Sequence, residues 1–239
     1  AMESAIIKNA HKINDGETLD LNIKTTDFFC LKRYQVTDVQ GVLIALVRDI
    51  LPKNVGAASN EIQVLTPMRK GELGVERLNK LLQEYLNPKD ESKREKEVGE
   101  RLFREGDKVM QIKNNYDITW DKDDGTDGTG IFNGDVGLLE SVDMGSGVLH
   151  IRFDDKVALY MVEFVDQLEL AYAVTVHKSQ GSEYECVVMP VSDMPPQLKY
   201  RNLLYTGVTR AKNMLVLVGK QQVVEEMTQN VKRTRRYIL

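Results

Sequence analysis

The sequence predicts an α/β fold in which a parallel-sheet domain is interrupted by a small antiparallel β-barrel. Segments typical of strands and helices alternate over the first 86 residues, and the same alternation returns after residue 171. Between them, short strand-like segments follow one another with turn residues in between, as in a barrel. We therefore expect residues 1–103 and 170–239 to form one α/β domain and residues 104–169 to form the inserted barrel.

The first part contains the helices and strands of an α/β unit. Three segments place apolar side chains at helical spacing, namely residues 2–14, 38–51 and 75–86. Pro52 is expected to end the second of these helices. Residues 28–34 and 62–66 are expected to be strands, and right-handed crossovers between them imply a parallel sheet. In the third helix, four side chains are expected to face inward: Leu78, Leu81, Leu82 and Tyr85.

The middle part is predicted to begin with a solvated stretch. Residues 89–108 hold seven acidic and seven basic side chains. Six short β-type runs follow, at 108–112, 131–132, 137–142, 148–153, 156–161 and 167–170. Residues 117–127, which hold five aspartates around the single tryptophan, Trp120, are expected to be a loop.

The last part resumes the pattern of the first. Residues 187–191 and 214–218 are short apolar runs that predict buried strands, whereas 200–208 and 221–232 are expected to be helices. Together with the strands of the first part, they complete the α/β domain.

Composition and charge exclude several classes of protein. Hydrophobic residues make up 42% of the 239 residues and the net charge is −4, so neither a disordered chain nor a uniformly basic coat protein is expected. No apolar run approaches the ~20 residues of a membrane span and no signal peptide is visible, so we expect a cytoplasmic protein without a membrane partner. Cys30 and Cys186 are expected to be buried thiols. Because the three histidines share no ligand spacing, no metal site is predicted.

The most informative stretch runs from Thr175 to Glu183, between two apolar runs. It gathers hydroxyl, imidazole, ammonium and amide groups around Gly181, at the kind of sheet edge where α/β proteins bind ligands. Phosphate oxygens could be bound there, although the same residues would also suit a helix cap.

Two further stretches carry charged residues beside glycine. In residues 203–212, Tyr205, Thr209 and Lys212 would share one helix face, and Arg210 could either reach across a cleft or form an ordinary ion pair. Residues 66–74 form a strand-to-helix loop in which glycines allow close backbone approach and Arg69-Lys70 supply charge.

Taken together, these stretches resemble the C-terminal part of RecD-type superfamily-one DNA helicases, relatives of the exonuclease V alpha subunit. Residues 175–183 are similar to their motif V, 203–212 to motif VI, and 65–74 with Leu78-Asn79 to the motif IV region. The resemblance covers nearly the whole chain, in the expected order. It implies the second RecA-like domain of a two-domain motor, with an SH3-like barrel inserted.

The resemblance also implies roles for individual residues. Arg210 would be the catalytic arginine finger, which stabilises charge on the γ-phosphate. The nucleotide-binding residues would be Arg69, Lys70, Gln180, Gly181 and Glu183. Either Arg69 or Lys70 would make the motif IV contact. The DNA-binding residues would be Thr66, Thr175, His177, Lys178, Ser179, Tyr205 and Thr209.

The sequence lacks a G-x-x-x-x-G-K-[S/T] phosphate loop and an acidic pair for Mg²⁺. The resemblance therefore implies that this chain is the C-terminal motor domain of an ATP-dependent 5′-to-3′ DNA helicase. Without the rest of the helicase, the chain is expected to be inactive. ATP and Mg²⁺ would be cofactors of the full-length protein, with none bound tightly by this chain. The expected partners are single-stranded DNA, the N-terminal RecA-like domain and subunits of a nuclease complex. The alternatives are a nucleic-acid-binding or partner-docking module without ATP dependence, and the helicase part of a conjugative relaxase.

Overall fold

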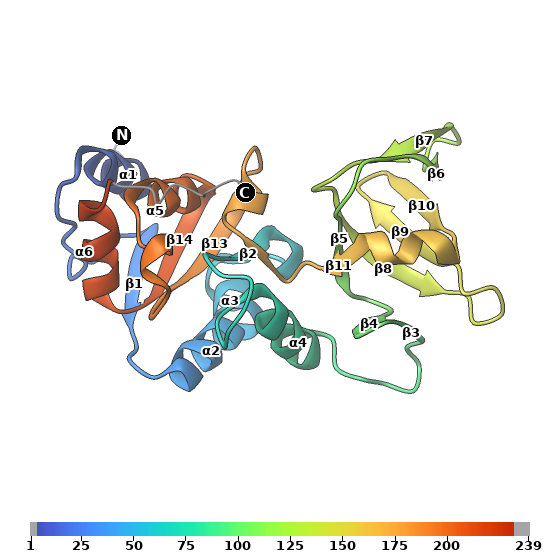
Figure 1. Cartoon of the computed structure of the whole chain (residues 1–239), viewed down its shortest axis with the longest axis horizontal. Helices are drawn as coiled ribbons and strands as arrows, with labels where there is room; N and C mark the ends of the chain where they lie inside the picture. Colours follow the sequence, from blue (N-terminus) through green and yellow to red (C-terminus); the bar gives the residue numbers. More distant parts are fainter. Residues whose placement is uncertain (1–3, 232–239) are drawn as a thin grey trace, which may run out of the picture. The chain divides into compact units, whose positions relative to one another are not determined.

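A computed structural model describes residues 4–231 of the chain, whose elements are labelled in Figure 1. It divides into two compact units: an α/β unit, made of the residues up to Leu78 and from Ala173 onward, and a β unit, Asn79–Tyr172. The predicted boundaries were 103/104 and 169/170. The difference at the first boundary arises because residues 79–103 contribute the end of a helix and a β-hairpin to the β unit.

The α/β unit is built on a five-stranded sheet with the order β1-β14-β13-β2-β12, in which every neighbouring pair is parallel. The strands are β1 (Phe28–Lys32), β2 (Ile62–Thr66), β12 (Ala173–Thr175), β13 (Tyr184–Val191) and β14 (Ala211–Gly219). β2 is buried along its whole length, and β13 and β14 are buried over their last six residues. The apolar runs that predicted strands are therefore the centre of the sheet, which confirms the α/β fold class.

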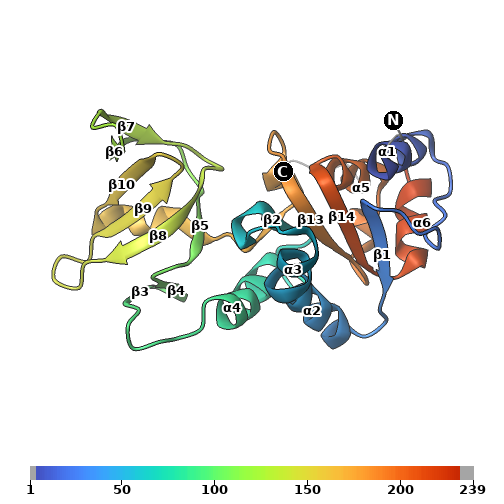
Figure 2. The same ribbon diagram turned by 180° about the vertical axis from the view of Figure 1, so that it is seen from behind.

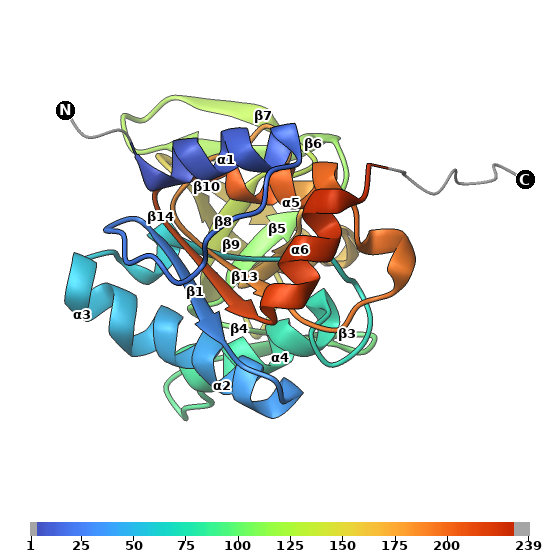
Figure 3. The same cartoon turned by 90° about the vertical axis from the view of Figure 1, so that its left-hand side faces the viewer.

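Helices cover both faces of this sheet. Figure 3 shows α1 (Ala5–Asp15), α5 (Arg201–Val208) and α6 (Gln221–Gln229) on one side and α2 (Val36–Ala45) and α3 (Leu51–Val55) on the other. The helix α4 (Val75–Leu86) has the predicted bounds. Of its four predicted inward residues, Leu78 and Leu82 are buried, whereas Tyr85 is 45% exposed. For α6, Lys232 of the predicted range lies outside the described residues.

The helical segment from Val36 does not stop at Pro52. It passes through a π-helical turn, η1 (Leu46–Ile50), and continues as α3, in which Pro52 occupies the first turn. The amide of Leu51 bonds to the carbonyl of Leu46, five residues back. Such a widened turn can accommodate a proline ring that would otherwise collide with the preceding turn. The expectation that Pro52 ends the helix was therefore wrong, and the helix ends only at Gly56, in the left-handed conformation.

The β unit is a seven-stranded antiparallel sheet with the order β11-β5-β8-β9-β10-β6-β7. Its strands are β5 (Lys108–Gln111), β6 (Asn115–Lys122), β7 (Asp127–Ile131), β8 (Val136–Val142), β9 (Leu149–Phe153), β10 (Lys156–Tyr160) and β11 (Leu168–Leu170). Alternate residues along the strands point into one apolar core, which includes Phe103, Leu139, Leu149, Ile151 and Tyr160. The predicted antiparallel insert is confirmed.

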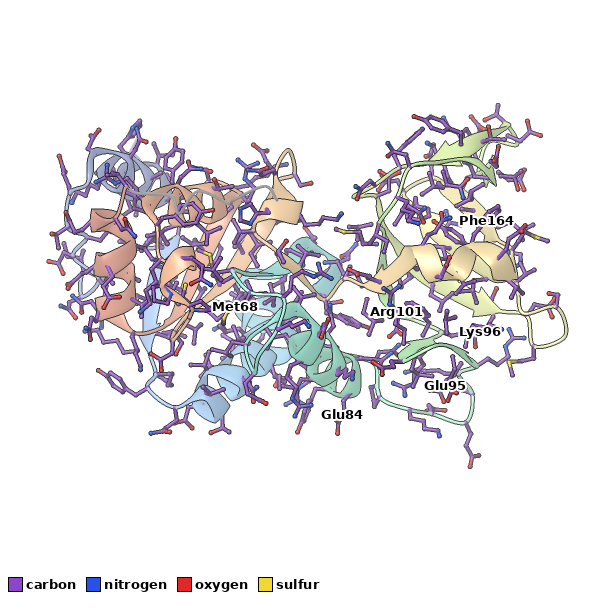
Figure 4. The ribbon with its side chains drawn as sticks, in the orientation of Figure 1. Met68, Glu84, Glu95, Lys96, Arg101 and Phe164 are labelled. Atoms are coloured by element: carbon purple, nitrogen blue, oxygen red, sulfur yellow. The ribbon has the colours of Figure 1, made fainter. Side chains whose placement is uncertain are left out.

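Two segments of the β unit were predicted incorrectly. Residues 117–127 are not a loop, because β6 and β7 pair as a hairpin in which Trp120 faces Gly128. A Cβ atom at Gly128 would lie 2.5 Å from the Trp120 ring, so the hairpin requires glycine there. The charged stretch 89–108 contains a second hairpin, β3 (Glu95–Val98) with β4 (Arg101–Arg104). Arg101, labelled in Figure 4, donates to the carbonyls of Asp166 and Leu168 and links this hairpin to the segment that ends in β11.

Candidate functional site

The predicted site residues lie at two opposite edges of the parallel sheet. Figure 2 shows β2, β13 and β14 side by side in this sheet. β2 and β12 end together, with Thr66 beside Thr175 in the strand register, and this is the carboxyl edge. β13 and β14 begin together, with Tyr184 beside Ala211, and this is the amino edge. Because all strands are parallel, a residue that follows β2 or β12 and a residue that precedes β13 or β14 are at different edges.

At the carboxyl edge, the loop from β2 to α4 is tightly folded. The Thr66 hydroxyl donates to the Leu73 carbonyl at 2.7 Å, and the Val75 amide donates to the Met68 carbonyl at 3.0 Å. A Cβ atom at Gly74 would lie 2.5 Å from the Lys70 oxygen, so only glycine fits the turn. Arg69 and Lys70 occupy the outside of this turn, and both are exposed.

The segment that follows β12 forms a second turn at the same edge. The Val176 amide donates to the Thr66 carbonyl at 3.0 Å, and the Lys178 amide donates to the Thr175 hydroxyl oxygen at 3.1 Å. His177 Nε2 lies 3.1 Å from the Tyr200 hydroxyl, next to the start of α5. The half-buried His177 and Lys178 therefore lie on the neighbouring turn to Arg69 and Lys70.

At the amino edge, Arg210 is held against the end of the 175–183 segment. Its Nε donates to the Thr206 carbonyl at 3.1 Å and its Nη1 donates to the Ser182 carbonyl at 3.2 Å. The Tyr184 amide donates to the Arg210 carbonyl at 2.9 Å, which fixes the backbone as well. The guanidinium is half-buried, and the neighbouring Glu183 carboxylate lies 3.9 Å from Lys212 Nζ. Arg210 and Glu183, to which the family resemblance gives roles in one nucleotide site, are thus at the same edge.

Several predicted contacts need correction. Thr66 and Ser179 are fully buried, and their hydroxyls donate to the carbonyls of Leu73 and Val176, so neither side chain is available to DNA. Tyr205, Thr209 and Lys212 do not share a helix face, because α5 ends at Val208 and Lys212 lies on β14. The Thr209 hydroxyl instead donates to the Tyr205 carbonyl at the helix end.

Of the remaining predicted nucleotide-binding residues, Gln180 and Gly181 are exposed on the segment between the two edges, where Gly181 has a left-handed φ of 85°. Arg69 and Lys70 are at the carboxyl edge, away from Arg210. The structure therefore divides the predicted nucleotide-binding set between the two edges.

Sequence reasoning missed a buried polar cluster in the β unit. The Asp107 carboxylate is fully buried and accepts four hydrogen bonds, 2.6–2.8 Å long. The donors are Gln83 Nε2, Asn87 Nδ2, the Arg104 amide and the Tyr172 hydroxyl. Burial raises the pKa of Asp107, and the four hydrogen bonds oppose that rise. No signal within the charged stretch 89–108 marks this carboxylate as buried.

The Asp107 cluster joins the two places where the chain enters and leaves the β unit. Gln83 and Asn87 come from the end of α4 and the residue after it, and Tyr172 is the last residue before the α/β unit resumes. Burial, together with the Asp107 charge, raises the pKa of Tyr172, so its hydroxyl stays a hydrogen-bond donor. The cluster therefore holds the first and last segments of the β unit together.

Both cysteines have raised pKa values because of burial. Cys186 is buried, as predicted, whereas Cys30 is only half-buried. Among residues 4–231, no group of three or more His, Cys, Asp or Glu side chains is arranged to hold a metal ion. In the same range, no helix is long and apolar enough to cross a membrane.

Gly207 fits α5 closely against β13, and its replacement by alanine is expected to destabilise the α/β unit. A Cβ atom at Gly207 would lie 2.7 Å from Met189 Sδ, so the helix or the methionine must move, at a cost of about 1–3 kcal/mol. Thermal unfolding followed by circular dichroism measures the change. Gly41→Ala in α2 is the matched control, because nothing lies within 4 Å of its Cβ position. Equal melting temperatures for the two variants would contradict the close packing.

Comparison with known proteins gives two family matches. Residues 78–153 match the ATP-dependent RecD-like DNA helicase SH3 domain, and residues 170–218 match the UvrD-like helicase C-terminal domain. The chain is 32% identical over 219 residues to the ATP-dependent RecD2 DNA helicase of Deinococcus radiodurans, covering 92% of this chain and 27% of that protein. It is 30% identical over 179 residues to the RecBCD enzyme subunit RecD of Haemophilus influenzae, covering 73% of this chain and 24% of that protein. The chain thus spans about a quarter of the length of these relatives.

Solved structures support the same fold. A structure of Pif1 helicases at forked double-stranded DNA aligns with a TM-score of 0.53 at 17% identity, covering 93% of this chain and 49% of that chain. Bacteroides Pif1 bound to single-stranded DNA aligns with a TM-score of 0.52 at 15% identity, covering 93% of this chain and 51% of that chain. At these identities the likeness shows the fold alone.

Proposed function

We propose that this chain, which belongs to the RecD-type helicases and corresponds to their C-terminal region, is the second motor domain of an ATP-dependent DNA helicase. Its amino edge would face the nucleotide and its carboxyl edge would face single-stranded DNA. The observation that carries the proposal is the arrangement of Arg210, whose guanidinium donates to the carbonyls of Thr206 and Ser182 at the amino edge, where Glu183 follows Ser182 in the chain.

In this proposal Arg210 is the arginine finger. A guanidinium has five N–H donors in a planar fork. Its Nε and Nη1 atoms already donate to carbonyls of its own domain, which holds the group in place before any nucleotide binds. Such a fixed positive charge stabilises the negative charge that spreads over the phosphoryl oxygens during transfer. Glu183, at the same edge, would accept hydrogen bonds from the ribose hydroxyls.

The 175–183 segment would connect the two edges. It leaves the carboxyl edge at Thr175 and reaches the amino edge at Glu183, alongside α5. Near its start, His177 contacts Tyr200, the residue that precedes α5. Near its end, the Ser182 carbonyl accepts a hydrogen bond from Arg210, which follows α5. His177 and Lys178 would contact the DNA backbone, and Gln180 would link them to the nucleotide.

Several finer features of the proposal rest on the family resemblance. These are the 5′-to-3′ direction, the use of ATP with Mg²⁺ by the full-length protein, and the association with nuclease-complex subunits. The N-terminal RecA-like domain would supply the phosphate loop and the metal ligands. This chain would supply the finger and part of the DNA track.

The 239-residue chain alone is expected to hydrolyse no ATP, with or without single-stranded DNA, because transfer also needs the phosphate cradle and the metal. It should still bind single-stranded DNA weakly, and more weakly as salt increases. A coupled ATPase assay and fluorescence anisotropy of a labelled oligonucleotide measure the two properties. The full-length protein, assayed in parallel, should hydrolyse ATP faster when DNA is present. ATP turnover by the 239-residue chain, or no DNA-dependent turnover by the full-length protein, would refute the proposal.

A further inference from the structure

Arg69 and Lys70 share an edge of the sheet with His177 and Lys178. The loops that carry the two pairs leave neighbouring strands at the same level, since Thr66 and Thr175 are partners in the register of β2 and β12. The Val176 amide donates to the Thr66 carbonyl and ties the start of one loop to the other. Four basic or imidazole side chains therefore come from two adjacent turns.

The loop that carries Arg69 and Lys70 is fixed by its own backbone. The Gly74 amide bonds to the Gly71 carbonyl, and the Glu76 amide bonds to the Arg69 carbonyl. Glu72, the acidic residue of the loop, is engaged by Gln40 and lies 3.6 Å from Arg77. Arg69, Lys70 and Glu72 are all exposed, so two positive charges outweigh one negative charge and the loop carries a net positive charge.

Arg210 is too far away to share a phosphate with these residues. Val64 of β2 lies beside Val188 of β13, so Thr66 is level with Pro190, six residues beyond Tyr184. Six residues of a parallel strand span about 20 Å. Because Arg210 lies beside Tyr184, a nucleotide whose γ-phosphate contacts Arg210 has its phosphates near the opposite edge from Arg69.

We propose that Arg69 and Lys70 bind backbone phosphates of single-stranded DNA and do not bind the nucleotide. This assignment rests on the proposed function, and it replaces the nucleotide role that the family resemblance implied for these two residues. With His177 and Lys178, they form a phosphate-binding row across the ends of β2 and β12. Basic and imidazole side chains in such a row can contact the phosphates of the strand without reading its base sequence.

The test uses the double variant Arg69→Gln with Lys70→Gln in the 239-residue chain. Affinity for a labelled oligothymidylate is measured by anisotropy over a series of salt concentrations. Loss of two phosphate contacts should reduce the slope of log affinity against log salt by about 1.4, since each single-strand contact contributes ~0.7. The charge-matched control, Lys24→Gln with Lys53→Gln, changes two exposed lysines that precede β1 and β2, and it should leave the slope unchanged. An unchanged slope in the Arg69/Lys70 variant would overturn the assignment.

The full-length protein separates failure of this assignment from failure of the proposed function. In the Arg69/Lys70 variant, the KM for ATP at saturating DNA should stay within about twofold of wild type, and the DNA concentration for half-maximal ATPase should rise about tenfold, as for a loss of ~1.4 kcal/mol. A raised KM for ATP with unchanged DNA dependence would restore the nucleotide role and overturn the assignment, while leaving the helicase function intact. Absence of DNA-dependent ATPase in the wild-type protein would instead overturn the proposed function.

Discussion

Replacement of Arg210 by alanine in the full-length protein is expected to lower ATP turnover by about 10³-fold or more. The guanidinium is held beside Ser182 at the amino edge, where the proposed nucleotide would develop charge during phosphoryl transfer. Affinity for single-stranded DNA should stay near the wild-type value, because the DNA-facing residues are at the opposite edge. Steady-state ATPase assays at saturating DNA, with anisotropy for DNA binding, measure both quantities.

Two control variants sharpen this prediction. Arg210→Lys keeps the charge but loses the planar fork, so it should recover only part of the turnover. Arg48→Ala removes an exposed arginine whose partner is Asp49, and it should leave turnover unchanged. If Arg210→Ala retained wild-type turnover, the finger assignment would be wrong, and a DNA-binding module without ATP dependence would become the better explanation.

Replacement of Asp107 by alanine is expected to lower the free energy of unfolding of the β unit by at least about 4 kcal/mol. The change removes a charged acceptor of four hydrogen bonds, and a hydrogen bond to a charged group contributes ~1.5–3 kcal/mol. Trp120 is the single tryptophan of the chain and packs at the margin of the β-unit core, so its fluorescence reports the unfolding of this unit in urea.

Asp117→Ala is the matched control for this variant. Asp117 is an exposed aspartate of β6, in the same unit, and its replacement should change the free energy of unfolding by less than ~0.5 kcal/mol. Similar denaturation midpoints for the two variants would show that the Asp107 hydrogen bonds do not stabilise the β unit.

The sequence predicted those parts of the fold in which apolar spacing and burial agree. β2 and α4 have the predicted bounds, because a run of five buried residues and a regular helical stripe leave few alternatives. The β6–β7 hairpin was missed because several of its exposed positions are aspartates and its pairing contains a bulge, which hides the alternation of the inward residues. The continuation of the helix through Pro52 was missed because it depends on the π-helical turn before Pro52, and no individual residue in the sequence predicts such a turn.

For the candidate site, the sequence indicated the residue types, but it did not indicate which side chains are buried or at which edge of the sheet each residue lies. Burial of Thr66 and Ser179 depends on which carbonyl each hydroxyl reaches, and that is a property of the folded turns. The separation of Arg69 from Arg210 depends on strand register, which one sequence does not reveal. Asp107 was hidden because a buried carboxylate and a solvated one look alike within a charged stretch.

Gln83, Asn87 and Tyr172 all donate to Asp107, so the β unit connects its own first and last segments. The segments by which the chain enters and leaves this unit are joined by hydrogen bonds to Asp107, a residue of the same unit. Residues 79–172 therefore contain the whole hydrogen-bonded cluster. A change in the length of the β6–β7 hairpin would leave this connection intact, because no residue of that hairpin donates to Asp107.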